Sequence, residues 1–230
     1  MTENFSIRNG NLQATNTLNT LKLVPTGDDD LPTLKGGPLN VEYEFVEIHF
    51  HWGEDESDNG SEHKIDGKSF PMEMHIVHKN IHDDSIEEAL THENGLAVLG
   101  FKFAVVKDDK RVNPGMDTLT KLARQHLAKP GSVAQADKLP CFQDVAIINF
   151  LPQLLDCYFY YSGSLTTGTH SEAVNWIVFK NPLAIHKDNL WDFQSMMDDL
   201  GKPLINNYRP VQPVNDRPLY YHGGEFLKSE

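Results

Sequence analysis

The order of apolar and polar residues along the chain predicts a protein built mainly from β-strands. Strand-like stretches, either alternating or continuously apolar, recur between clusters of Gly, Asp, Asn and Ser. They cover residues 18–25, 31–39, 42–52, 70–78, 95–106 and 172–182. Helical signals are few and fall near residues 83–93, 114–129 and 188–200, and the last helix is expected to end at Gly201. The pattern therefore favours an α+β fold in which strands dominate.

Two of these stretches predict different kinds of strand. Residues 42–52 alternate, so their two faces are expected to differ. The expected faces are Tyr43, Phe45, Glu47, His49 and His51 on one side, and Glu44, Val46, Ile48, Phe50 and Trp52 on the other. Residues 96–106 are apolar almost throughout, which is typical of a strand that is covered on both faces.

Length, charge and cysteine content narrow the class of protein. The 230 residues contain no internal repeat or linker, which predicts a single domain over residues 1–230. A formal net charge of −13 disfavours nucleic acid and anionic membranes as partners, because phosphates would be repelled. No apolar run reaches the length of a membrane span, and the first residues lack the pattern of a signal peptide. With Cys141 and Cys157 both reduced, we expect a cytoplasmic protein that contacts no membrane.

Histidines provide the candidate chemistry. His49 and His51 lie two apart in a predicted strand, so both imidazoles point to the same side. Such a pair is often only a half-exposed polar pair. His75 lies in the next predicted strand, on the face opposite Met74. If the two strands are neighbours, three neutral imidazoles can converge on one ion and leave a fourth position open, which is the pattern of catalytic zinc.

Carboxylates accompany two of these histidines. Glu47 lies two residues before His49 and Glu73 two residues before His75, so each shares a strand face with its histidine. A carboxylate buried beside a metal-bound imidazole accepts the free ring N–H and fixes the ligating tautomer. An isolated glutamate is more often a solvated strand residue, but the matched placement of these two favours the supporting role.

Two other metal sites compete with this interpretation. Residues 55–66 imitate a calcium loop with Gly60 in sixth place, but helices do not flank them and no Glu ends the loop. We therefore favour a solvated turn. A cupin-type site also uses His-x-His followed by Glu and Gly, but the spacings in this chain fit that pattern poorly. His63 and His78 are not expected to be ligands, and His78 is expected to make a structural hydrogen bond.

A series of longer motifs resembles the α-class carbonic anhydrases. In chain order the motifs are "IHFHWG" (48–53), "GSEH" (60–63), "EMHIVHKN" (73–80), "GLAVLG" (95–100), "YSGSLTT" (161–167), "EAVNWIV" (172–178) and "NYRPVQP" (207–213). Separate motifs in the family's order over nearly the whole chain make the resemblance specific. It implies a strongly twisted, mostly antiparallel central sheet with peripheral helices and a conical cleft that leads to zinc.

The resemblance also implies roles for individual residues. His49, His51 and His75 would be the Zn²⁺ ligands. The residues behind these ligands would be Glu47, Glu73 and, through its backbone carbonyl, Asn207. Thr166 would hydrogen-bond zinc-bound hydroxide and pass its own proton to Glu62, so these two would be the catalytic pair. The contacts to carbon dioxide would come from Val77, Val98, Leu165, Thr167, Val174 and Trp176.

The implied function is the reversible hydration of carbon dioxide to bicarbonate and a proton by zinc-bound hydroxide, in a monomeric enzyme. Zinc with three neutral imidazoles keeps its full charge and lowers the pKa of bound water to about 7, a value that is known for carbonic anhydrase itself. The alternative is a catalytically weak or silent binding module related to carbonic anhydrase. Silent relatives typically lose a ligand histidine, whereas this chain keeps all three, so we favour the enzyme.

Departures from the family pattern bear on activity. Asn11 stands where fast members carry a proton-shuttling His, so we expect slower turnover that imidazole buffers rescue. Glu47 replaces a common Gln, which is expected to make zinc-bound water less acidic. Gly168–Thr169 replace the usual Pro-Pro, and His170 replaces the Cys of exported members. The shared pattern is already under way at "IRNGN" (residues 7–11 of this chain). We therefore expect that the chain lacks an N-terminal segment that in the family normally supports the threonine–glutamate pair.

Overall fold

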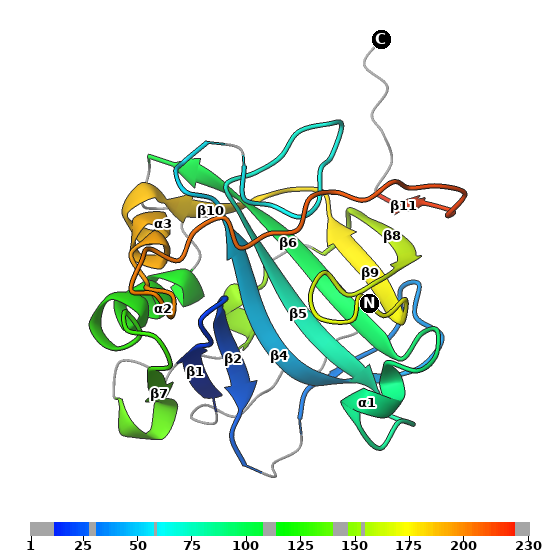
Figure 1. The fold of residues 1–230 in the computed structure, drawn as a ribbon. Coiled ribbons are helices and arrows are strands. Elements are labelled where there is room, and N and C mark those ends of the chain that lie inside the picture. The colour runs from blue at the N-terminus through cyan, green and yellow to red at the C-terminus, as the bar shows by residue number, and fades with distance from the viewer. Residues whose placement is uncertain are drawn as a thin grey trace.

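A large, mostly antiparallel sheet forms the centre of the molecule (Figure 1). The structure is a computed structural model that describes residues 12–27, 31–57, 59–107, 114–139, 147–152 and 155–223. Within these residues the strand order is β11-β8-β9-β6-β5-β4-β2-β1-β7, and β3 and β10 pair with β4 and β6. The pairs β6–β9 and β6–β10 are parallel, and the other pairs are antiparallel. The predicted strand-dominated α+β fold is therefore confirmed.

The bounds of the elements are as follows. The strands are β1 (Leu12–Asn16), β2 (Leu21–Pro25), β3 (Thr33–Leu34), β4 (Tyr43–Trp52), β5 (Met72–Asn80), β6 (Leu96–Val106), β7 (Val133–Gln135), β8 (Tyr158–Gly163), β9 (Val174–Phe179), β10 (Leu183–His186) and β11 (Tyr220–His222). The helices are α1 (Ile86–Ala89), α2 (Pro114–His126) and α3 (Lys187–Gln194), and the 3₁₀ turns are η2 (Ala136–Lys138) and η3 (Ile147–Phe150). None of the helices in the described part of the chain is long and apolar enough to cross a membrane.

The two faces of the central strands bury different apolar clusters. On β5, Met74 and Ile76 belong to the larger core, which also contains side chains of α2 and α3. Val77, on the opposite face of β5, belongs to a smaller cluster with Val98 and Trp176. Each fully buried side chain of this kind contributes about 1.5–3 kcal/mol of transfer free energy. Met74 therefore lies on the face of β5 opposite Val77, and the first eight residues of β6 are buried, as predicted for a strand covered on both faces.

The predicted alternation of β4 is wrong for its first half. The pairing of β4 with β5 shifts register between Phe45 and Glu47, so Val46 is an extra residue in a β-bulge. Tyr43 and Phe45 consequently lie in the larger core together with Ile48, which the alternation assigned to the other face. A bulge inverts the facing of every residue on one side of it, and nothing in the alternation itself marks the inversion. The bulge leaves Glu47 and the histidines on the side of β4 that faces away from the larger core.

The predicted helices are longer than the observed ones. The helix predicted for residues 188–200 ends at Gln194, with Ser195 as its C-cap, and not at Gly201. Met196 and Leu204 are buried in the core and their backbones are hydrogen-bonded to each other, so tertiary packing ends the helix early. Strands β1, β7, β8, β10 and β11 were not among the predicted strands. Each has only three to six residues, a short pattern that is hard to read from sequence.

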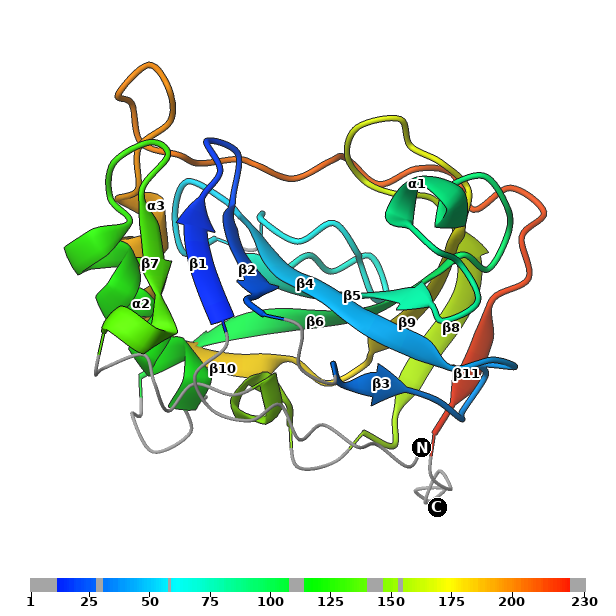
Figure 2. The ribbon, with the colours of Figure 1, turned by 90° about the horizontal axis from the view of Figure 1, so that it is seen from below.

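The chain after α3 runs across the sheet as an irregular segment. It leaves the α3 end of the molecule, passes over the central strands and reaches β11 at the opposite end (Figures 1 and 2). Asn207 lies in this segment and ties it to β4. Its Nδ2 donates to the carbonyl of Phe50 at 3.2 Å, and its Oδ1 accepts the N–H of Trp52 at 2.7 Å. The segment thereby brings a backbone carbonyl next to the histidines of β4.

Candidate metal centre

Three imidazoles from two neighbouring strands converge on one point. His49 and His51 come from β4 and His75 from β5, where it is the direct cross-strand partner of His49. His75 Nδ1 lies 3.2 Å from His51 Nε2 and 3.3 Å from His49 Nε2. The antiparallel pairing thus brings together the three residues that the sequence singled out as ligands. His51 and His75 are buried, and His49 is half-buried.

The other nitrogen of each ring faces a hydrogen-bond acceptor. His49 Nδ1 lies 2.9 Å from Glu47 Oε1, and His51 Nδ1 lies 2.9 Å from the carbonyl oxygen of Asn207. His75 Nε2 lies 2.8 Å from Glu73 Oε1. A carbonyl and an ionised carboxylate can only accept, so each outer nitrogen carries the ring proton.

The protonation of the outer nitrogens leaves three lone pairs facing one another. Nitrogen atoms without protons do not hydrogen-bond to each other, so the short separations between the inner nitrogens call for a cation. An ion bound tetrahedrally about 2.05 Å from each nitrogen would separate its ligand atoms by about 3.3 Å. The observed 3.2 and 3.3 Å fit this geometry. Neutral nitrogen ligands with an open fourth corner are suited to Zn²⁺.

Burial keeps the imidazoles neutral, and neighbouring positive groups keep the Glu47 carboxylate charged. Burial lowers the pKa of His75 to about 4, against the influence of Glu73, and lowers the pKa of His51 well below its usual value. Burial raises the pKa of Glu47, but His49 and Lys22 outweigh this effect and bring that pKa down to about 2. The centre is therefore ready to accept a cation at neutral pH without first losing protons.

Glu73 contacts His63 as well as the ligand candidate His75. His63 Nδ1 lies 2.5 Å from Glu73 Oε1, and the backbone N–H of His63 donates to Glu73 Oε2 at 2.8 Å. His63, Glu73 and His75 are close enough to form a metal-binding group of their own. Since Glu73 must accept from both rings, we favour a hydrogen-bonded chain. It ends at Tyr161 Oη, 2.7 Å from His63 Nε2.

A buried lysine faces Glu73 from the next strand. Lys102 on β6 is the cross-strand partner of Glu73 on β5, and its side chain has 0% exposure. Its Nζ donates to the carbonyl of Phe179. Burial lowers the pKa of Lys102 to about 8, although the negative charge of Glu73 acts in the opposite direction. The prediction of an apolar strand over residues 96–106 took no account of this lysine.

The catalytic pair implied by the resemblance lies beside the same centre. Glu62 Oε1 accepts the backbone N–H of Arg209 at 2.7 Å, and Glu62 Oε2 lies 3.3 Å from His51 Nε2. Oε2 is buried and has no hydrogen-bond partner of ordinary geometry among the described residues. Burial raises the pKa of Glu62 to about 7, although Arg209 and the Thr166 hydroxyl oppose the shift. A positive charge at the histidine centre would restore the ionised form.

The residues implied as substrate contacts gather next to the histidines, with one exception. Val77, Val98, Val174 and Trp176 form the smaller apolar cluster, and Leu165 packs against it. The rings of Trp176 and His75 have centroids 4.7 Å apart. The indole N–H donates to the carbonyl of Ser164 at 3.0 Å, so the polar edge of the ring is already satisfied. Thr167 is exposed and is not part of the cluster.

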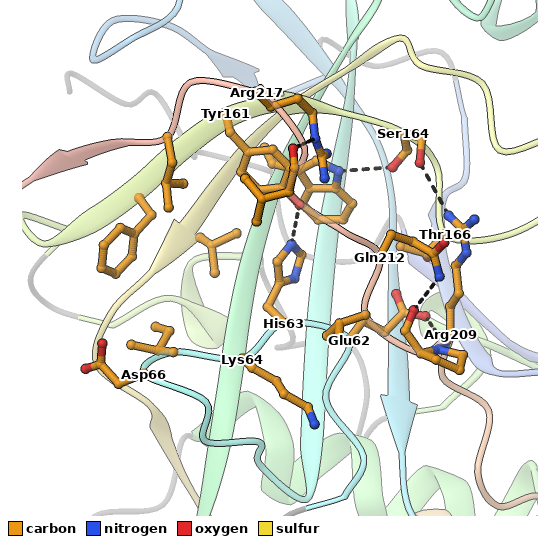
Figure 3. A pocket seen from close by; sticks show the side chains of 18 of the residues that line it. Glu62, His63, Lys64, Asp66, Tyr161, Ser164, Thr166, Arg209, Gln212 and Arg217 are labelled. Carbon is orange, nitrogen blue, oxygen red and sulfur yellow. Dashed lines mark hydrogen bonds between the residues drawn. The ribbon is translucent and has the colours of Figure 1, made fainter.

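A pocket of about 420 Å³ is lined by Glu62, Thr166 and Trp176 among others. Figure 3 shows Glu62, Thr166 and Arg209 along one of its sides and the paired His63 and Tyr161 along another. The Arg217 guanidinium lies over the ring of Tyr161, 5.3 Å from its centroid. The remaining lining residues include Ile65, Phe159, Val178, Val211, Val214 and Leu219.

Several sequence predictions concern residues that lie elsewhere. Asn11, Cys141 and the stretch 7–11 fall outside the described residues. Cys157 is a free thiol. His78 is fully buried beside Phe45, and neither of its ring nitrogens has a hydrogen-bond partner of ordinary geometry among the described residues. The backbones of Ala97 and Ile76 nevertheless act on the ring and oppose the burial that lowers the pKa of His78 to about 4, so the structural hydrogen bond of His78 stays a prediction.

Residues 55–66 connect β4 and β5 without flanking helices. Asp55 Oδ1 accepts the N–H of Ser57 at 2.8 Å, which is an ordinary turn contact. The structure therefore gives no helix pair to support a calcium loop in the described part of this stretch.

Sequence reasoning missed several residues that support the centre. Lys22, Lys102, Tyr161 and Arg209 each act through contacts between segments that are far apart in the chain. A lysine inside the apolar run of residues 96–106 was the one available signal, since an unpaired buried lysine is costly. The others required the register of the sheet and the path of the segment after α3.

Comparison with known proteins places the chain among carbonic anhydrases. The family model for eukaryotic-type carbonic anhydrase matches residues 1–223. The chain is 36% identical over 196 residues to mitochondrial carbonic anhydrase 5B of Homo sapiens, covering 83% of this chain and 57% of that protein. It is 37% identical over 190 residues to carbonic anhydrase 4 of Rattus norvegicus, covering 80% of this chain and 58% of that protein. It is 37% identical over 211 residues to carbonic anhydrase 7 of Homo sapiens, covering 90% of this chain and 75% of that protein.

Proposed function

The chain belongs to the eukaryotic-type carbonic anhydrase family, and from this premise we propose that it catalyses the zinc-dependent, reversible hydration of carbon dioxide to bicarbonate and a proton. The observation that carries the proposal is the set of three inward lone pairs on His49, His51 and His75. Zinc, when bound there, acts as a Lewis acid that lowers the pKa of a coordinated water to near neutrality, as in the well-known example of this same family.

Glu62 and Thr166 have complementary parts in this proposal. Thr166 donates its hydroxyl proton to the Glu62 carboxylate, which the Arg209 N–H already holds at Oε1. The Thr166 oxygen can then only accept a hydrogen bond from a group beside the histidine centre. The pair therefore orients the reacting oxygen by accepting a hydrogen bond from it.

The apolar cluster suits a small, non-polar substrate. Val77, Val98 and Trp176 present hydrocarbon beside the histidines, and the indole N–H is turned toward Ser164. Carbon dioxide has no net dipole, so it gains little from a polar pocket, and water is poorly held by an apolar wall. The same wall does not retain bicarbonate, which favours product release. The complete ligand set is what favours the enzyme over the alternative of a silent binding module.

The experiment combines metal content and carbon dioxide hydration in one preparation of the chain. We expect one zinc per chain and a hydration rate that is lost on chelation and restored by added zinc. Thr166→Val should keep its zinc and lose about 10²-fold in kcat/KM, which is the lower end for loss of a positioned proton-transfer group. Thr169→Val is the matched control, because Thr169 is an exposed threonine of the same loop that hydrogen-bonds only Ser171 among described side chains.

Two results would overturn the proposal. One is a chain that holds zinc in full and hydrates carbon dioxide no faster than the buffer does. The other is equal activity of the Thr166 and Thr169 variants at a wild-type rate, which would remove the catalytic pair from the account.

A further inference from the structure

A carboxylate on β4 bridges a lysine and a metal-centre histidine. Lys22 on β2 is the cross-strand partner of His49 on β4. Its Nζ lies 2.6 Å from Glu47 Oε2, while Glu47 Oε1 lies 2.9 Å from His49 Nδ1. One oxygen of the Glu47 carboxylate therefore pairs with the ammonium group, and the other accepts a hydrogen bond from the imidazole.

We propose that Lys22 is a positioning residue of the metal centre, which holds Glu47 so that His49 directs its Nε2 lone pair inward. The proposal rests on the proposed function, since it assigns a role at the same centre. A glutamate side chain has three rotatable bonds, and Glu47 is 18% exposed, so water competes for both of its oxygens. An ammonium group at one oxygen restricts the carboxylate to rotamers that leave the other oxygen beside His49.

Lys22 also balances the charge that Glu47 adds to the centre. An amide at this position could accept the ring N–H without a charge, whereas a carboxylate brings a negative charge close to the metal ligand. Beside an unbalanced carboxylate, the imidazole would carry more negative charge and the bound cation would be a weaker Lewis acid. An ammonium group 2.6 Å from the carboxylate limits this effect.

The second carboxylate of the centre also has a lysine opposite it, although that lysine donates its hydrogen bond to the Phe179 carbonyl. Lys102 is the cross-strand neighbour of Glu73, and the negative charge of Glu73 acts on it. The third ligand, His51, rests on the neutral carbonyl of Asn207. Among the three ligands, the two that rest on carboxylates are thus the two with a lysine on an adjacent strand. This coincidence is what an ordinary surface ion pair would not predict.

The simpler interpretation is a surface ion pair with no further role, which contributes about 0–1 kcal/mol to stability. Lys35 and Glu42 form such a pair at 3.8 Å, and the described contacts of Glu42 lead to Thr33 and not to a histidine. Lys35→Met is therefore the matched control for Lys22→Met, because each variant removes one partly exposed lysine from one carboxylate.

The test uses the full chain and two measurements that need no catalysis. Nitrogen NMR of the zinc-free chain reports which nitrogen of His49 carries the proton, and competition with a chelator gives the zinc dissociation constant. For Lys22→Met we expect a mixed His49 tautomer and a dissociation constant about tenfold higher, the lower end for loss of an outer partner. Lys22→Arg should restore the single tautomer, and Lys35→Met should resemble the wild type.

A double-variant comparison separates the positioning role from general destabilisation. In a Glu47→Gln background the amide carries no charge to be held, so adding Lys22→Met should change the dissociation constant less than about twofold. An undiminished effect in that background would overturn the proposal, as would equal behaviour of Lys22→Met and Lys35→Met. The His49 tautomer is measured without zinc or carbon dioxide, so it tests Lys22 even if the proposed hydration activity fails.

Discussion

The proton on each imidazole ring is placed by the group behind that ring. Glu47 and Glu73 could be found from the sequence because a strand repeats every two residues, which sets each of them beside its histidine. Asn207 could be assigned only through the family resemblance, since its carbonyl comes from a segment more than 150 residues away in the chain. The buried Lys102 was missed because the apolar residues around it predicted an uninterrupted hydrophobic strand.

Lys102 gives the folded chain a measurable pH dependence. Its pKa is about 8 in the folded chain against 10.5 as the ordinary value. Between these values the unfolded chain binds a proton that the folded chain does not, so the free energy of unfolding rises with pH. Over the full interval the increase is about 3 kcal/mol, at 1.36 kcal/mol for each pKa unit.

Denaturant titrations of the wild type and Lys102→Met at pH 8 and pH 10.5 measure this increase. Subtracting the free energy of unfolding of the variant from that of the wild type removes the contribution of the tyrosines and the other lysines. This difference in free energy should be larger at pH 10.5 than at pH 8. A difference that stays constant would contradict the assigned burial of the ammonium group. Lys35→Met, which removes an exposed lysine, should show no such growth.

Irregular features, such as the bulge in β4, determine which residues face the histidine centre as much as the regular strands do. The bulge at Val46 separates the core-facing half of β4 from the half that carries the histidines. Sequence alternation predicted the facing of Glu47, His49 and His51 but not that of Tyr43 and Phe45. An alternating pattern does not indicate where an extra residue is inserted in a strand. The early end of α3 has a similar origin, since burial of Met196 outweighs the local helical pattern.

The segment after α3 offers a test at this scale through Asn207. Asn207→Ala removes the amide contacts to Asn19, Phe50 and Trp52, and so releases the carbonyl that His51 uses. We expect zinc affinity to fall about tenfold. Leaving the Trp52 N–H without its partner should also cost about 1–3 kcal/mol of stability. Chelator competition and thermal unfolding measure the two effects.

Asn206→Gly is the control for this variant. Asn206 is an exposed neighbour with φ of +55°, a conformation that glycine adopts freely, and its amide reaches only Glu54 among the described side chains. Equal zinc affinity of the two variants would show that the Asn207 amide does not position the segment.

The sheet and the segments around it bring residues from distant parts of the chain together at the histidine centre. The order of the motifs predicted the fold class, and it also singled out the three histidines that β4 and β5 bring together. The pairing of β1, β8 and β11, and the path of the segment between α3 and β11, depend on contacts across the entire chain. Such contacts are set by packing that no local pattern records, so these parts required the structure.

The central claim is that His49, His51 and His75 hold one zinc ion through their inward nitrogens. X-ray absorption spectroscopy of the zinc-loaded chain measures this directly. The account predicts one zinc per chain, with three imidazole nitrogens and one further light atom at about 2.0–2.1 Å. Fewer than three imidazole ligands, a sulfur ligand, or a spectrum that His75→Ala leaves unchanged would contradict it.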